Sequence, residues 1–132
     1  MCSSDLQGEV CQAANDNADG QVVVSGAKAA IERAVEIAKG RGAKRAMLLN
    51  VSAPFHCALM QPAADAMAEA LAKVTIARPV VPVVSNVAVA GISDPDEIRK
   101  RLVEQVTGTV RWRESVRFLA AHGVTQIGRA HV

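Results

Sequence analysis

Residues 46–51, with the sequence AMLLNV, form a nearly continuous apolar run that is too short for an ordinary helix. Such a run is typical of a strand buried on both faces of a sheet, and a strand of this kind needs helices to cover it. A helix is expected directly afterwards, over residues 59–74, with Pro62 in the first turn, where its missing N–H is not needed. Its expected buried stripe is Leu59, Ala63, Met67, Leu71 and Val74. A buried strand that leads into an amphipathic helix predicts an α/β fold.

The rest of the chain continues this alternation. A dense turn signal, NDNADG, occupies residues 15–20. Further strands are expected at residues 22–24, 79–84 and 124–127, and further helices at residues 27–39, from residue 94 onward, and at residues 112–122. The helix that begins at Asp94 has the clearest start, because Asp94 can cap it, Pro95 suits its first position and Glu97 can close a capping box.

Composition excludes several classes of protein. A formal charge of +2, with no arginine-rich run among aromatics, gives no indication of nucleic-acid binding. The cysteines Cys2, Cys11 and Cys57 lack C-x-x-C spacing and are odd in number, which favours a reducing cytoplasm over a disulfide framework. The histidines lack the spacing of metal ligands, so no metal site is expected. No apolar run approaches the roughly 20 residues of a membrane span, so no membrane association is expected.

The histidine of the stretch APFHCALM, His56, lies between the apolar run and the helix that follows it. A neutral imidazole is the usual general base for a hydroxyl or thiol near neutral pH, so His56 is a candidate base. A loop histidine without chemistry is the alternative from the residues alone. Cys57 is poorly placed as a nucleophile for His56, because adjacent side chains point in different directions. No serine lies in a G-x-S-x-G elbow, so the nucleophile is expected outside this chain.

Three segments together resemble the malonyl-CoA:acyl carrier protein transacylases. NVSAPFHCALMQPAADAMAEAL resembles the histidine segment of that family, ANDNADGQVVVSGAKAAIERA a segment of its small subdomain, and RLVEQVTGTVRWRESVRFLAAHGV a segment late in its large subdomain. The resemblance covers nearly everything from Gly8 to Ile127. It implies that residues 8–50 are part of a ferredoxin-like small subdomain and residues 51–127 the C-terminal part of a hydrolase-like large subdomain. Residues 1–7 and 128–132 are expected to be non-native ends.

The resemblance implies ping-pong acyl transfer. In the family, a serine in a G-H-S-x-G elbow takes malonyl from coenzyme A, a histidine handles the proton, and the phosphopantetheine thiol of the carrier protein then receives the malonyl group. His56 matches that histidine, and Gln105 matches the position whose backbone carbonyl orients it. Phe55, Asn15 and Asn17 match positions of the substrate pocket. The alternatives are a solvated helix residue for Gln105, simple packing for Phe55, and ordinary turn chemistry for the two asparagines.

The predicted function is therefore that of part of an [acyl-carrier-protein] S-malonyltransferase of fatty-acid biosynthesis, cytoplasmic and monomeric when complete. Its expected substrates are malonyl-CoA and acyl carrier protein, with no permanently bound cofactor. The chain as given is expected to be inactive, because the family's serine segment lies upstream of the residues present. An acyltransferase domain of a polyketide synthase and a non-catalytic carrier-binding fragment are the alternatives. Six basic residues suit either a docking face for an acidic carrier protein or solvated helix faces: Arg99, Lys100, Arg101, Arg111, Arg113 and Arg117.

Overall fold

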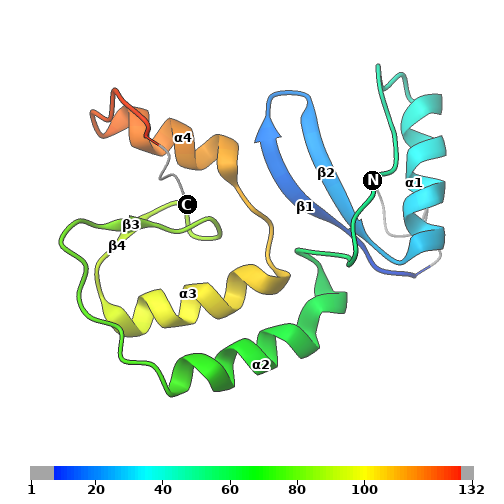
Figure 1. Cartoon of the computed structure of the whole chain (residues 1–132). Helices are drawn as coiled ribbons and strands as arrows, with labels where there is room; N and C mark the ends of the chain where they lie inside the picture. Colours follow the sequence, from blue (N-terminus) through cyan, green and yellow to red (C-terminus); the bar gives the residue numbers. More distant parts are fainter. Residues whose placement is uncertain (1–7, 129–132) are drawn as a thin grey trace.

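The first part of the chain is a β-hairpin with a helix beside it, as Figure 1 shows for the computed structural model, which describes residues 8–128. Strand β1 (Cys11–Ala18) pairs antiparallel with β2 (Gln21–Gly26), and α1 (Lys28–Gly40) follows. The helix was predicted from its apolar spacing, and it buries two alanines, Ala30 and Ala34. Side chains this small allow the helix to lie close to the hairpin.

The turn predicted over residues 15–20 is wrong for most of its length. Residues 15–18 belong to β1, and only Asp19 and Gly20 connect the two strands, with Gly20 in the left-handed region at φ +79°. The strand continues because β2 pairs with it as far as Ala18, and its second edge has a further partner far along the chain. The N–H of Val110 donates to the Ala14 carbonyl at 2.8 Å, and the N–H of Asp16 donates to the Val110 carbonyl at 2.9 Å. Backbone pairing thus overrides the local turn preference of these polar residues.

The second part of the chain is built around two packed helices. A 3-10 turn, η2 (Ala58–Met60), leads into α2 (Gln61–Ala72), which lies against α3 (Pro95–Thr107) (Figure 1). Pro62 lies in the first turn of α2, as predicted. The predicted cap of α3 is also confirmed, because the Asp94 carboxylate accepts a hydrogen bond from the Glu97 N–H at 2.9 Å. Two short antiparallel strands, β3 (Val83–Val84) and β4 (Gly91–Ile92), precede α3, and α4 (Trp112–Ala121) follows it.

Several predicted strands and a predicted buried stripe are wrong within the described residues. Residues 46–51 and 124–127 lie in no strand, and of residues 79–84 only the last two pair with a neighbour. Their apolar side chains are exposed: Leu49 to 55% and Ile127 to 66%. Of the predicted stripe, Leu59 in η2 and Met67 on α2 are also exposed, and the residue that α2 buries is Ala64. The physical reason is the same throughout, since an apolar strand or stripe is buried only where another layer covers it, and residues 8–128 provide no such layer at these places.

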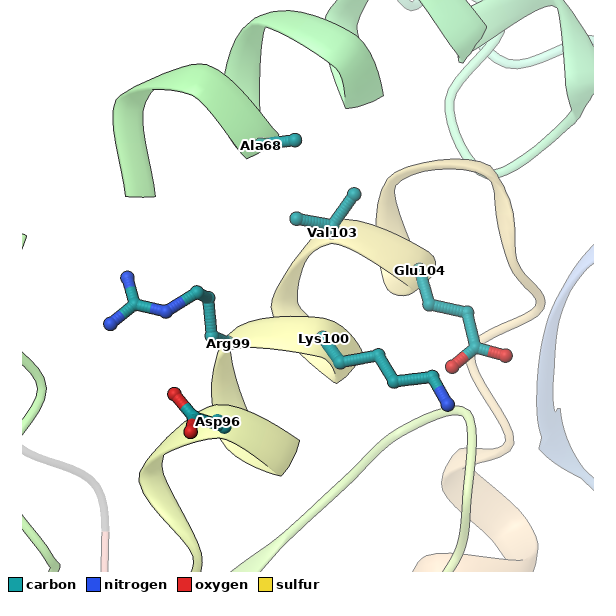
Figure 2. A pocket seen from close by; sticks show the side chains of 6 residues that line it. All are labelled: Ala68, Asp96, Arg99, Lys100, Val103 and Glu104. Atoms are coloured by element: carbon teal, nitrogen blue, oxygen red, sulfur yellow. The ribbon is translucent and has the colours of Figure 1, made fainter. Parts of the chain in front are cut away.

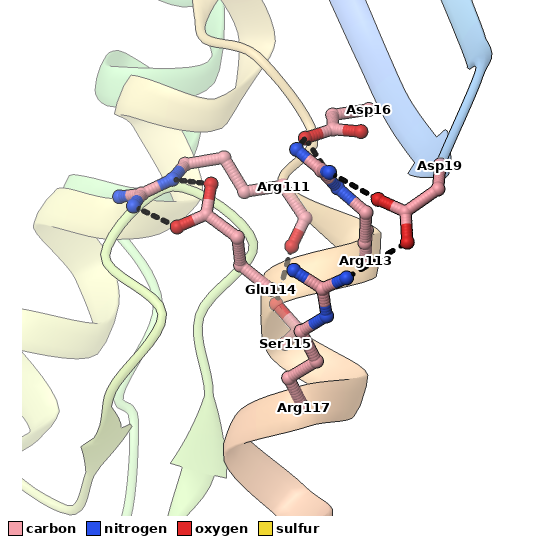
Figure 3. A network of polar contacts seen from close by, with 7 residues as sticks. All are labelled: Asp16, Asp19, Arg111, Arg113, Glu114, Ser115 and Arg117. Atoms are coloured by element: carbon pink, nitrogen blue, oxygen red, sulfur yellow. Dashed lines mark hydrogen bonds and ion pairs between the residues drawn. The ribbon is translucent and has the colours of Figure 1, made fainter.

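Ion pairs attach α4 to the hairpin (Figure 3). Arg113 binds Asp16, with 2.7 Å between Nη2 and Oδ2, and also binds Asp19 in the hairpin turn. Arg117 approaches the same Asp19 carboxylate to 2.9 Å. The hydrogen bond from Arg113 and the charge of Arg117 hold the pKa of Asp19 below its usual value. On α4 itself, the hydrogen bond from Arg111 lowers the pKa of Glu114 in the same way.

These two lowered pKa values predict loss of stability in acid. A carboxyl group whose pKa is lower in the folded state stabilises the fold above its unfolded pKa, and this contribution disappears as the pH falls through the folded value. The unperturbed values are 3.8 for Asp19 and 4.5 for Glu114. We therefore expect the free energy of unfolding, from urea titrations followed by circular dichroism, to be steady from about pH 7 to about pH 5 and to decrease below that.

The double variant Asp19→Asn, Glu114→Gln should be less stable than the unmodified chain at neutral pH and should show a shallower decrease in acid. The control Asp96→Asn, which changes an exposed carboxylate at the start of α3, should leave the decrease in place. An unchanged acid profile in the double variant would contradict the assignment.

Candidate functional site

The candidate base, His56, occupies a strained position in the turn that precedes η2. Its backbone lies in the left-handed region at φ +58°, which costs a residue other than glycine about 1 kcal/mol or more. The turn is held by its own hydrogen bonds: the Phe55 N–H donates to the Ala53 carbonyl at 3.0 Å, and the Cys57 thiol donates to the Pro54 carbonyl at 3.1 Å. Backbone strain of this kind persists only where the surroundings hold it, and it is concentrated at functional sites.

The His56 ring contacts the backbone of α3. Its Nδ1 lies 2.8 Å from the carbonyl oxygen of Gln105. A carbonyl can only accept a hydrogen bond, so Nδ1 carries a proton, and in the neutral imidazole the lone pair is then on Nε2. That tautomer is the one that a general base requires at Nε2. The structure thus brings together the two residues that the sequence singled out as a base and its orienting carbonyl, while their catalytic role stays a prediction.

The carbonyl of Gln105 is available because of its place in the helix. It is among the last four carbonyls of α3, which have no partner within the helix. The Gln105 side chain is held separately: its Oε1 accepts a hydrogen bond from Asn86 at 3.4 Å, and the Asn86 carbonyl accepts one from the Arg111 N–H at 3.0 Å. The end of α3 is therefore fixed by the turn between β3 and β4. Asn86 was not predicted as part of the site, since it only follows an apolar run in the sequence.

The two described cysteines flank the contact between β1 and the His56 turn. Cys57 is fully buried, and its thiol is engaged with a backbone carbonyl, which fits packing better than a nucleophilic role. Burial and the nearby Cys57 thiol raise the pKa of the Cys11 thiol, so Cys11 is a weak nucleophile at neutral pH. Both cysteines are free. Cys2 lies outside the described residues.

Another contact that the sequence did not predict joins β1 to the segment after His56. The Ala58 N–H donates to Oε1 of Gln12 at 2.7 Å, across 46 residues of sequence. No local pattern around Gln12 indicates this contact, because it depends on the tertiary arrangement. Asn15 and Asn17 lie further along β1 and are half-buried, so their predicted place in a substrate pocket stays a prediction. Phe55 lies next to His56 with 47% of its surface exposed.

Within residues 8–128, no group of three or more histidine, cysteine, aspartate or glutamate side chains is arranged to hold a metal ion. Across the same range, no helix is both long and apolar enough to cross a membrane.

The geometry predicts that the Gln105 side chain is dispensable for orienting His56. In Gln105→Ala the backbone carbonyl remains, so we expect ¹⁵N NMR of the imidazole to show the same Nδ1–H tautomer as in the unmodified chain. His122 serves as an internal reference, because its Nδ1 lies 2.8 Å from the Phe118 carbonyl. Loss of the Nδ1–H form of His56 alone would show that the side chain, rather than the carbonyl, sets the orientation.

Comparison with known proteins relates this site to one family of enzymes. A scan against models of protein families gave no match. Over 126 residues, 96% of its length, the chain is 49% identical to the malonyl CoA-acyl carrier protein transacylase of Salmonella typhimurium. It is 44% identical to the transacylase of the same name from Bacillus subtilis strain 168, over 90% of its length. The chain spans only 41% and 38% of these two relatives, respectively.

Solved structures give the same result. The acyl-carrier-protein-S-malonyltransferase from Bartonella henselae matches 93% of this chain and 39% of its own, with a TM-score of 0.89 and 54% identity. A malonyl-transacylase in complex with its type II polyketide synthase acyl-carrier protein matches 93% of this chain and 40% of its own, with a TM-score of 0.90 and 46% identity. The chain is therefore similar, in sequence and in structure, to about two fifths of each of these proteins.

Proposed function

We propose that this chain is part of an [acyl-carrier-protein] S-malonyltransferase, to which it contributes the base, His56. The observation that carries the proposal is the 2.8 Å contact between Nδ1 of His56 and the Gln105 carbonyl, which leaves Nε2 free to accept a proton. The similarity to transacylases over nearly the whole chain supports the same assignment. The chain contains no G-H-S-x-G sequence, so the serine nucleophile would come from another part of the complete protein.

The proposed reaction has two acyl transfers. Nε2 of His56 takes the serine proton as the serine oxygen attacks the malonyl thioester; the carbon–sulfur bond then breaks, and the proton passes to the coenzyme A thiolate. In the second half, Nε2 takes the proton of the carrier protein's phosphopantetheine thiol as its sulfur attacks the malonyl-serine ester. The bond between the acyl carbon and the serine oxygen then breaks, and the proton returns to the serine oxygen. The Gln105 carbonyl stabilises the transient imidazolium because it accepts from Nδ1–H throughout.

The division of the chain and its cellular setting belong to the same proposal. Residues 8–50 would be part of a ferredoxin-like small subdomain, a role supported by the succession of β1, β2 and α1. Residues 51–127 would be the C-terminal part of a hydrolase-like large subdomain. The complete enzyme would be a cytoplasmic monomer that uses malonyl-CoA and an acyl carrier protein and needs no bound cofactor. The polyketide alternative requires the same chemistry, and one similar transacylase is solved with a polyketide synthase carrier protein.

The basic residues of the C-terminal half do not support a docking face for the carrier protein. Arg101 pairs with Glu97 and Glu104, and Arg99 donates to the carbonyls of Leu71 and Val74 at the end of α2. The hollow beside α3 is of mixed charge (Figure 2): it is lined by Ala68, Asp96, Arg99, Lys100, Val103 and Glu104. Arg111, Arg113 and Arg117 are also paired with carboxylates. The basic residues are therefore better interpreted as solvated or internally paired than as a docking face.

A chimaera tests the proposal directly. Residues 8–127 replace the matching segment of the Salmonella typhimurium transacylase, and mass spectrometry follows the transfer of malonyl from malonyl-CoA to a carrier protein. We expect the chimaera to be active and His56→Ala to lower kcat by about 10²- to 10⁴-fold, the usual contribution of a general base, with an unchanged circular dichroism spectrum. The control His122→Ala, at the exposed end of α4, should retain activity. A folded but inactive chimaera would overturn the proposal.

The place of Phe55 predicts an effect on acyl selectivity. We propose that its ring, next to His56, excludes an α-methyl group from the acyl site, and a single methyl group changes selectivity by about 10-fold or more. In the chimaera, Phe55→Ser should raise kcat/KM for methylmalonyl-CoA relative to malonyl-CoA by about 10-fold. The control Leu59→Ser removes another exposed apolar side chain of the same segment and should leave the ratio unchanged. An unchanged ratio in Phe55→Ser would assign Phe55 to packing.

A further inference from the structure

We infer that Gln12 is a positioning residue for His56, an inference that rests on the proposed role of His56 as the base. The Oε1 atom of Gln12 accepts the Ala58 N–H at 2.7 Å, two residues after the histidine. Gln12 therefore holds the chain just beyond the strained turn, from a strand that lies far away in the sequence. The Gln12 side chain contacts the backbone of Ala58 rather than the His56 ring, so it would act on the reaction only through the position of His56.

The start of the helical segment has no acceptor of its own for this N–H. The first N–H groups of a helix have no partner within it, and a side chain at the N-cap usually supplies one. Cys57 occupies the N-cap of η2 and makes no side-chain cap, because its thiol is directed at the Pro54 carbonyl. Gln12 supplies the missing acceptor from a distant part of the chain, so it serves as a cap for η2 in place of the residue that directly precedes it.

The same strand also holds the other partner of the imidazole. Beside Gln12, the Ala13 carbonyl accepts a hydrogen bond from the Thr109 hydroxyl at 2.6 Å, and the Ala14 carbonyl accepts the Val110 N–H at 2.8 Å. These two partners directly follow the end of α3, which carries the Gln105 carbonyl. Consecutive residues of β1 thus bind both the segment after His56 and the segment after Gln105. The distance between imidazole and carbonyl is therefore set by one extended strand.

The beginning of β1 is itself closely fitted, which makes it a firm support. The Ala27 N–H donates to the Val10 carbonyl at 2.9 Å, and a Cβ on Gly26 would lie 2.0 Å from that carbonyl oxygen. The backbone of β2 can come this close to β1 only because residue 26 is glycine. Gln12 therefore lies two residues beyond a tight backbone contact. Because this contact restrains the strand, the hydrogen bond from Gln12 can restrain the position of Ala58.

The first experiment uses the chain itself and needs no catalysis. Gln12→Met keeps the length of the side chain and removes the acceptor oxygen, whereas Gln12→Glu keeps an acceptor at the helix start. For Gln12→Met we expect about tenfold faster hydrogen exchange at the Ala58 amide and a reduced Nδ1–H population of His56 by ¹⁵N NMR, with Gln12→Glu close to the unmodified chain. Gln61→Ala is the matched control, because the Gln61 side chain, at the start of α2, binds Asp65, while its backbone N–H, which donates to the Ala58 carbonyl, is kept in the variant. An unchanged His56 tautomer in Gln12→Met would overturn the inference.

The second experiment separates positioning from general stability. In the transacylase chimaera, Gln12→Met should lower kcat about 5- to 10-fold with KM for malonyl-CoA unchanged, and Gln12→Glu should restore most of kcat. A loss that falls on KM, or an equal loss in Gln61→Ala, would show a merely structural role and overturn the inference. If the unmodified chimaera is inactive, the proposed function fails, and the NMR comparison still decides whether Gln12 orients His56.

Discussion

Backbone pairing between β1 and Val110 joins the two parts of this chain. The hairpin would otherwise meet the helical part through side chains only, and the hydrogen bonds of Ala14 and Asp16 with Val110 bridge about 95 residues of sequence. Closing a loop of this length costs entropy, which the fold recovers through several contacts formed together. The ion pair between Arg113 and Asp16 and the hydrogen bond between Thr109 and Ala13 also join β1 to residues 109–113. The geometry around His56 depends on these contacts with β1, because β1 binds Ala58, after the histidine, and residues 109–110, after α3.

The helices could be predicted from the sequence because their causes are local. Apolar spacing indicated α1, and Asp94 and Pro95 marked the start of α3 to the residue. Strands depend on partners, and the partners are distant. Residues 15–18 are in a strand because β2 pairs with them and Val110 bonds to the other edge at Ala14 and Asp16, and the apolar residues 46–51 are in none because nothing within the described residues pairs with them. Periodicity indicates which face of an element is apolar, but it does not show whether another layer covers that face.

The site was predictable to the same degree. The position of His56 between an apolar run and a helix marked it as a candidate base, and resemblance to transacylases supplied its backbone partner at Gln105. The tautomer, the strained backbone of His56 and the contact from Gln12 could not be obtained from the sequence. The tautomer and the contact from Gln12 depend on atoms that are close in space and separated by 49 and 46 residues. The strained backbone depends on hydrogen bonds within its own turn, which no sequence pattern indicates. A glutamine has no spacing rule of the kind that identifies metal ligands or caps, so its role is visible only in three dimensions.

The uncovered apolar segments have a consequence for the chain in a cell. Met47, Leu49, Val81 and Ile127 expose apolar side chains on segments that lie in no strand, and exposed apolar segments of this kind can pair with other chains. A newly made chain of this sort is a substrate for chaperones that hold unfolded proteins, and at high concentration it joins aggregates through the same segments. Association through these segments would therefore compete with the folding of the hairpin and helices. A further polypeptide segment that covers these side chains would prevent such association.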